Sequence, residues 1–331
     1  MRATLKAVRA SEESTQASNI RHQADARAAL KRHRVEDRKW REEQYGERYQ
    51  AAASQLGHSS AAVRLAGVYA MSRLADEWSN QRQACIDVLC AYARTSFEHS
   101  QIDERQVRRA IAEEVFRRLQ TSEPSWAGQR IDLSGAYIED LQFPHRVLRN
   151  LRMDGAWFEG FNVLSRAQVV GAVSFRGAHF SGSFRLLTSA NDDSFISFAD
   201  CEIAGKRFHV GVSRVGPRDS RDKVLLNLNN LMVTSGAVFF SLRGHFTHRA
   251  VWGSRAAIRG RSKMMFNLSK GSAAENSIIL RDLAVEAQAD ILCNDPLRGA
   301  AISLGDMNWV TPGKLTDLDF QGYDPDPMTD L

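Results

Sequence analysis

The chain has 331 residues, of which 43% are apolar and 25% are charged, and its formal net charge is +5. This balance is typical of a globular protein that is long enough for a hydrophobic core and more than one domain. It disfavours an acidic mimic of nucleic acid, and with no run of about 18 apolar residues we expect no membrane span.

Residues 1–43 are rich in charged residues and alanine and contain few large apolar side chains. We expect a charged helix or a flexible arm in this segment. Basic residues recur in Lys31–Arg34 and Arg38–Arg41, so contact with nucleic acid or anionic lipid is an alternative. The acidic residues between them disfavour that alternative.

Residues 44–124 have the periodicity of a small helical bundle, and we expect HEAT-like hairpins. Gly57 ends a first helix, and the serines that follow can cap a second. Further helices are predicted from about Asn80 and from Asp103, whose carboxylate is a good cap. Pro124 ends the region. The residues expected to face inward include Val68, Met71, Leu74, Ile86, Leu89, Val107, Ile111 and Val115.

One six-residue phrase recurs between residues 133 and 203. Its frame is a large apolar residue, any residue, Gly or Asp, a small residue, any residue, and a second large apolar residue. The four copies are Leu133–Ile138, Met153–Phe158, Phe175–Phe180 and Phe198–Ile203. Their starts lie 20, 22 and 23 positions apart, and such periods are typical of a solenoid.

The two large residues of each phrase are five positions apart, a spacing that neither an α-helix nor a flat strand explains. Five steps of about 100° scatter side chains around a helix, and an odd spacing sends them to opposite faces of a strand. All of them can point inward only if the chain bends once per unit. We expect the Gly or Asp to supply the bend, and four such steps to make one square turn. The run that keeps this step is Leu133, Ile138, Phe143, Leu148, Met153, Phe158 and Val163.

The phrase Leu133–Ile138 resembles the pentapeptide-repeat family, whose members form right-handed quadrilateral β-helices. The alanine that the family prefers two places before the central large residue is present at Ala136, Ala156 and Ala178. The helical segments Gly57–Leu74 and Val88–Arg94 are similar to the region that precedes the repeats in a group of actinobacterial pentapeptide-repeat proteins. The resemblance carries over no catalytic residue.

After Phe208 the frame loosens, although it returns at Leu280–Val285 and Leu315–Phe320. We therefore expect an α+β chain in which the N-terminal helical region is followed by an irregular right-handed β-helix, a pentapeptide-repeat-like solenoid, over residues 125–321. Residues 322–331, with prolines among aspartates, are predicted to form a disordered acidic tail.

The four cysteines, Cys85, Cys90, Cys201 and Cys293, show neither the spacing of a disulfide framework nor that of a metal site. The N-terminus also lacks an apolar signal core. The sequence therefore predicts a cytoplasmic protein with buried thiols, and peripheral membrane association is an alternative.

Motifs for nucleotide binding, cofactor binding and known catalytic chemistry are missing from the sequence, so we expect no enzyme activity, no cofactor and no metal. His245 and His248 could bind a metal, but without Cys or carboxylate neighbours they are expected to be surface imidazoles. Asp192 and Asp193 could match the carboxylate pair of a β-helix carbohydrate enzyme, but their polar surroundings favour a loop.

Between Val224 and Ala274 the sequence contains no acidic residue, and aromatic residues are interleaved with basic ones. This composition is typical of surfaces that bind nucleic acid, lipid headgroups or acidic proteins. The candidate anion- or partner-binding residues are Arg243, Arg249, Arg255, Arg259, Arg261 and Lys263. The alternative is that the acidic residues in 275–331 neutralise this basic block within the molecule.

The sequence favours a non-enzymatic protein-interaction scaffold of unknown partner, because a solenoid buries its repeats and offers long flat faces. The alternative is weak binding of nucleic acid or an anionic lipid surface through the basic block 243–270. A carbohydrate-active β-helix enzyme is the third hypothesis.

Overall fold

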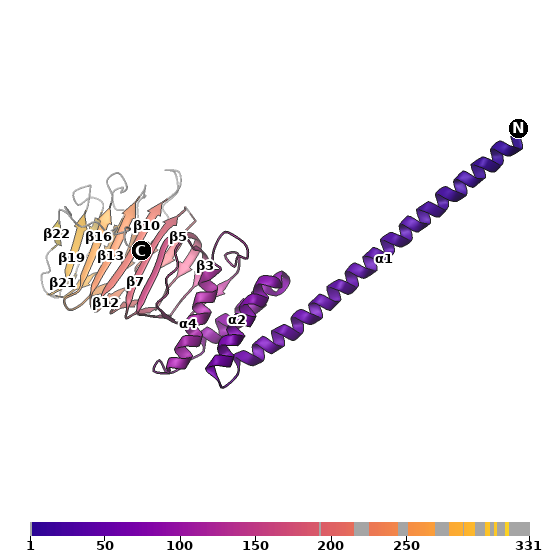
Figure 1. The fold of residues 1–331 in the computed structure, drawn as a ribbon. Helices are drawn as coiled ribbons and strands as arrows, with labels where there is room; N and C mark the ends of the chain where they lie inside the picture. The colour runs from indigo at the N-terminus through magenta and orange to yellow at the C-terminus, as the bar shows by residue number, and fades with distance from the viewer. Residues whose placement is uncertain are drawn as a thin grey trace.

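The computed structural model describes residues 2–191, 193–214, 225–243, 251–268, 278–286, 288–294, 302–304, 308–309 and 315–317. It has the predicted α+β architecture, in which N-terminal helices are followed by a parallel β-solenoid (Figure 1). Several sequence predictions lie outside the described residues, namely those for Asp192, His245, His248, Arg249 and the tail 322–331.

The helical region is built from α1 (Arg2–Leu56), α2 (Ala61–Glu77), η1 (Ser79–Gln81), α3 (Arg82–Arg94) and α4 (Ile102–Arg117). Helix α1 passes through residues 43 and 44 without a break, and most of its length extends away from the rest of the molecule (Figure 1). Its last turns pack on α2, where Gly67 allows a close approach. A Cβ atom at Gly67 would lie 2.8 Å from the backbone nitrogen of Leu56.

The apolar faces predicted for these helices are buried, and Val68, Met71, Ile111 and Val115 are all fully enclosed. The predicted cap of the last helix is wrong. Its N-cap is Gln101, and Asp103 lies within the first turn of α4. A carboxylate in that turn is favoured by the helix dipole without acting as the cap.

Each rung of the solenoid has three sides, and neighbouring rungs pair in parallel. The first side consists of β1 (Ile131–Asp132), the ends of β3 (Val147–Arg152) and β5 (Phe161–Ser174), β8 (Phe195–Ser197), β11 (Leu226–Asn227), β14 (Val251–Ser254), β17 (Ile278–Arg281) and β20 (Ile302–Leu304). The second side consists of β2 (Tyr137–Glu139), β4 (Trp157–Glu159), β6 (His179–Phe180), β9 (Glu202–Ile203), β12 (Met232–Val233), β15 (Ala257–Ile258), β18 (Ala284–Val285) and β21 (Asn308–Trp309). The third side consists of the start of β5, β7 (Ser183–Ala190), β10 (Arg207–Arg214), β13 (Ala237–Arg243), β16 (Lys263–Leu268), β19 (Asp290–Asn294) and β22 (Leu315–Asp317).

The large residues of the recurring phrase fill the interior, as predicted. Phe158, Phe175, Phe180 and Ile203 are each at most 1% exposed. The rings stack from rung to rung, with centroids 4.7 Å apart for Phe158 and Phe180. The small residues Ala156, Ala178 and Cys201 are fully buried beside them.

The bend predicted at the third position of the phrase is confirmed. Gly135, Gly155, Gly177 and Asp200 have φ angles of 72°, 66°, 67° and 59°, in the left-handed region that glycine and aspartate tolerate best. The same corner continues at Asn230, Arg255 and Asp282, whose φ angles are 53°, 55° and 50°. This corner, between the first and second sides, therefore repeats along the solenoid.

The five-residue step does not continue around the whole turn, so the predicted square is wrong. Val163 is only half-buried, and its neighbours Asn162 and Leu164 face inward instead. Strand β7 then alternates between half-buried and buried residues along its whole length. Because a straight strand has a period of two, one long third side replaces two sides of the square.

The helical region covers the end of the solenoid at its first rung. The backbone N–H of Val147 donates to the carbonyl of Leu119, at 2.8 Å, and the ring of Trp126 is fully buried. Arginines of α3 and α4 form ion pairs with first-rung carboxylates, in the pairs Arg94–Asp132, Arg105–Glu139 and Arg109–Asp140. This packing shields an end that would otherwise expose apolar residues and an unpaired strand edge.

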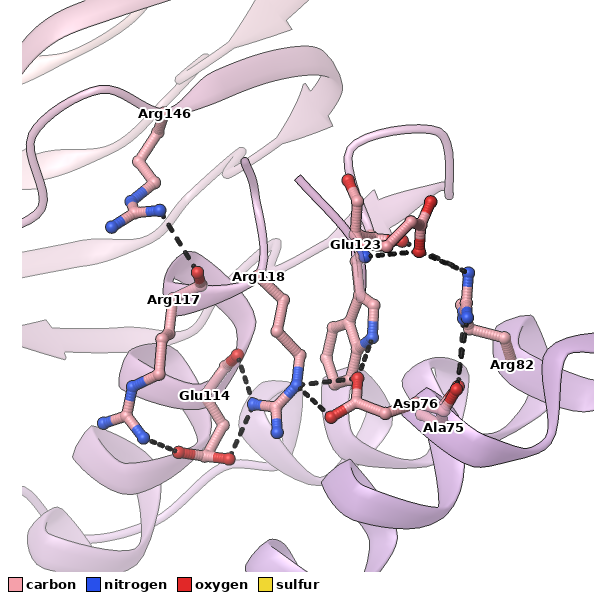
Figure 2. A network of polar contacts seen from close by, with 10 residues as sticks. Ala75, Asp76, Arg82, Glu114, Arg117, Arg118, Glu123 and Arg146 are labelled. Atoms are coloured by element: carbon pink, nitrogen blue, oxygen red, sulfur yellow. Dashed lines mark hydrogen bonds and ion pairs between the residues drawn. The ribbon is translucent and has the colours of Figure 1, made fainter. Parts of the chain in front are cut away.

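Figure 2 shows the polar network behind this junction. The Asp76 carboxylate of α2 accepts hydrogen bonds from Arg118 Nε, at 2.8 and 2.9 Å, and from the indole N–H of Trp126, at 3.0 Å. On its other side Arg118 donates to Glu114, at 2.6 Å. The network therefore joins α2 and α4 to the segment that leads into the solenoid.

Within the described part of the chain, no helix is long and apolar enough to cross a bilayer.

Candidate anion-binding face

Those of the predicted basic residues that the structure describes do not form one patch. Arg255 lies at the corner between the first and second sides, whereas Arg259 and Arg261 lie between β15 and β16, at the next corner. Lys263 begins β16, and Arg243 ends β13. The absence of acidic residues from one stretch of sequence therefore does not translate into one continuous surface.

Part of the basic block lies against residues of the acidic C-terminal segment. Arg259 Nε is 4.0 Å from a carboxylate oxygen of Glu286, which also accepts the backbone N–H of Gly260, at 2.7 Å. Arg261 Nε donates to the side-chain oxygen of Gln288, at 3.4 Å. Glu286 thus offsets the charge of Arg259, as expected if the acidic segment neutralises part of the basic block within the molecule.

The outer surface of the third side carries cations from several rungs. Strands β7 and β13 alternate, with inward residues buried and outward residues more exposed. The outward cations of β7, β10, β13 and β16, together with the residue before β10, are Arg185, Lys206, Arg207, Arg243 and Lys263. None of the outward residues on these four strands is acidic. We call this surface the basic face.

A groove of about 330 Å³ lies at the start of the basic face. Its lining includes Phe161, Arg185, Lys206 and Arg207, and the Phe161 ring is 44% exposed. Among the described residues, none of these three cations has an ion-pair partner. The groove therefore combines positive charge that no described carboxylate offsets with an exposed aromatic ring.

The adjoining second side has the opposite character. Its outward residues include Glu139, Glu159 and Glu202, and the Trp157 and His179 rings stack with centroids 4.3 Å apart. The modest net charge of the chain therefore hides a separation of charge between two neighbouring sides. An anionic ligand would be attracted to the basic face and repelled by Glu159 and Glu202 on the second side.

Sequence reasoning missed the cations of the groove because acidic residues separate them along the chain. Asp193, Asp200 and Glu202 lie between Arg185 and Lys206 in sequence, but none of the three lies on the third side. The signal that could have found the groove is the two-residue alternation of each long strand after the phrase. This alternation assigns Arg185 and Arg207 to the outer surface.

No group of three or more His, Cys, Asp or Glu side chains that could hold a metal ion occurs in the described part of the chain. In comparisons with known proteins, no family model, no curated protein and no solved structure matches this chain.

Proposed function

We propose that this chain is a non-enzymatic, cytoplasmic binding scaffold built on a pentapeptide-repeat-like solenoid with three sides per rung, and that its basic face docks an acidic segment of a partner protein. The observation that carries the proposal is the groove, in which Arg185, Lys206 and Arg207 surround the exposed Phe161 without a carboxylate partner among the described residues. Unpaired cations grouped at a hollow attract anions and raise the rate of encounter with them.

The shape of the face supports a short extended ligand. Arg185 pairs in register with His209, two residues beyond Arg207, and neighbouring rungs lie about 4.8 Å apart. The groove cations thus span adjacent rungs, a footprint that suits a few carboxylates of a peptide better than the long backbone of a duplex. The Phe161 ring can pack on apolar atoms of the same peptide.

Single-stranded nucleic acid is the second candidate, and the exposed ring of Phe161 is the observation that favours it. Bases stack on aromatic side chains that lie beside cations, with little dependence on sequence. The two candidates make different forecasts for the same titration, because stacking requires bases that a peptide lacks.

The test is a fluorescence-anisotropy titration of the full chain with a short labelled peptide of alternating Asp and Glu, and with a labelled oligothymidine. We expect the peptide to bind more tightly and its affinity to fall as salt rises. The double substitution Lys206→Gln with Arg207→Gln should weaken peptide binding by about tenfold, since each lost charge contributes about 0.7 kcal/mol.

The matched control is Arg149→Gln, which removes an exposed cation of β3 and should leave the affinity unchanged. Equal loss in the control and the double variant would show that only net charge matters, and would remove the groove as the docking site. Tighter binding of the oligothymidine would favour the nucleic-acid candidate over the acidic peptide.

A further inference from the structure

A second, smaller hollow lies further along the same strands, where β10 carries a glycine on its outer face. A Cβ atom at Gly211 would come within 2.7 Å of Leu187 Cδ2 and 2.9 Å of Ser241 Oγ. Leu187 and Ser241 therefore lie close over the glycine, and a pocket of about 100 Å³ lies beside them, between β7 and β13. We call it the Gly211 pocket.

The polar side chains around the Gly211 pocket can all donate hydrogen bonds, and none of them is acidic. His209 Nε2 and Ser241 Oγ are hydrogen-bonded at 3.0 Å, and Ser213 and Arg243 complete the polar lining. Thr188 also lines the pocket, but its hydroxyl donates to backbone carbonyls, including that of Ala167 at 3.1 Å.

Charge at the pocket is positive. The Arg243 guanidinium is exposed, and within the described residues it has no ion pair. No described residue of the lining carries a carboxylate. When the His209 Nε2–H donates to Ser241, the serine hydroxyl is left to donate into the pocket, so both side chains support an anion together.

We propose that the Gly211 pocket binds a phosphoryl group. A pocket of about 100 Å³ has room for several water-sized groups, and therefore for a phosphoryl group. Its donors come from β10 and β13, an arrangement that suits a tetrahedral anion better than a planar carboxylate. Arginine is well suited to bind phosphoryl oxygens through two donors at once.

This inference rests on the proposed function, because the pocket lies on the basic face, and it makes the acidic partner segment a phosphorylated one. The residues of the groove and of the pocket are different. Lys206 and Arg207 would attract the segment, and Ser241 and Arg243 would recognise its phosphoryl group.

The test begins with inorganic phosphate as the probe, in a calorimetric titration of the full chain at low ionic strength, with acetate for comparison. We expect phosphate to bind more tightly than acetate. Ser241→Ala and Arg243→Gln should each weaken phosphate binding by about tenfold, as expected for a lost hydrogen bond to a charged group. Gly211→Ala should abolish it, because the added methyl would displace Leu187 and the Ser241 hydroxyl, whereas Gly128→Ala, which adds a methyl in open space, should have no effect.

The groove variant separates this proposal from the preceding one. Lys206→Gln with Arg207→Gln should lose the acidic peptide and keep inorganic phosphate, so failure of peptide binding alone contradicts only the proposed function. A phosphoserine peptide should bind more tightly than its unphosphorylated form, and Ser241→Ala should remove that gain. Phosphate affinity unchanged in both Ser241→Ala and Arg243→Gln would overturn the pocket. If phosphorylation raises the affinity of an oligonucleotide with a 5′-phosphate more than that of the peptide, the phosphoryl group does not come from a protein partner, and that part of the proposal is wrong.

Discussion

Replacing Asp76 by alanine tests whether the junction network holds the helical region on the solenoid. The two carboxylate oxygens share the Nε–H of Arg118, and one of them also accepts the indole N–H of Trp126. The Arg118 and Asp76 side chains are only 14% and 19% exposed, so water can replace little of what is lost. Arg118 keeps Glu114 as a partner, and its charge is not left uncompensated.

The expected cost of Asp76→Ala has two parts. A hydrogen bond to a charged group contributes about 1.5–3 kcal/mol, and leaving the buried indole N–H without an acceptor costs about 1–3 kcal/mol. Because Arg118 retains a partner, we expect values near the lower end, for a total loss of about 3 kcal/mol in the free energy of unfolding.

The measurement is urea unfolding followed by tryptophan fluorescence and by circular dichroism. Asp87→Ala is the control, because Asp87 pairs with Arg130 at 3.4 Å in an exposed position and should cost less than about 1 kcal/mol. Trp126→Phe should lower the free energy of unfolding by about 1 kcal/mol less in the Asp76→Ala variant than in the unmodified protein, because the indole hydrogen bond is already lost there. An Asp76→Ala protein as stable as the Asp87→Ala control would refute the reasoning.

Two further predictions concern the solenoid. Ala178→Leu should lower the free energy of unfolding by about 1–3 kcal/mol by overpacking the fully buried stack, and urea unfolding should show a much smaller change for Ala257→Leu on the outer surface. Hydrogen bonds from Asn230 and Arg176 hold the pKa of the Asp200 carboxyl below its ordinary value of 3.8. The stability that they give is therefore present above that value and lost as the pH falls through the folded-state pKa. Asparagine also tolerates the left-handed backbone, so Asp200→Asn removes the charge and keeps the bend. Below about pH 4 the free energy of unfolding of this variant should therefore fall less than that of the unmodified protein. If urea unfolding shows the same decrease with acid for both proteins, the prediction is wrong.

The solenoid was predictable because its interior obeys a short pattern. The bends at Gly155 and Asp200 follow from residue types that tolerate positive φ. Later rungs nevertheless do not match the six-residue phrase, because their bend positions are occupied by Asn230 and Arg255. A frame that admits only glycine or aspartate is too narrow once neighbouring rungs hold the backbone in place. The straight third side was missed for another reason, since its alternation begins only after Gly160, where the five-residue step stops.

The groove was less predictable, because it depends on which rungs become neighbours. Arg185 and Arg207 are far apart in sequence, and the pairing of Phe184 with Phe208 brings their strands together. The dimensions of each rung decide this register, and the composition of any one stretch does not contain it. Arg243 was identified from sequence, but its place at the Gly211 pocket was not.

The recurrent left-handed corner restricts where the chain can change its length. From the first side to the second, each rung advances five residues, as from Ser174 to His179 and from Asn227 to Met232. Whole rungs nevertheless differ, since Tyr137 faces Trp157, twenty positions on, whereas Glu202 faces Met232, thirty positions on. Most of the extra residues fall between β10 and β11, beyond the end of a third-side strand. Insertions and deletions are therefore tolerated beside the basic face, while a single inserted residue between β8 and β9 would shift Asp200 away from its bend. Evolution can in this way vary one edge of the surface while the interior stays the same.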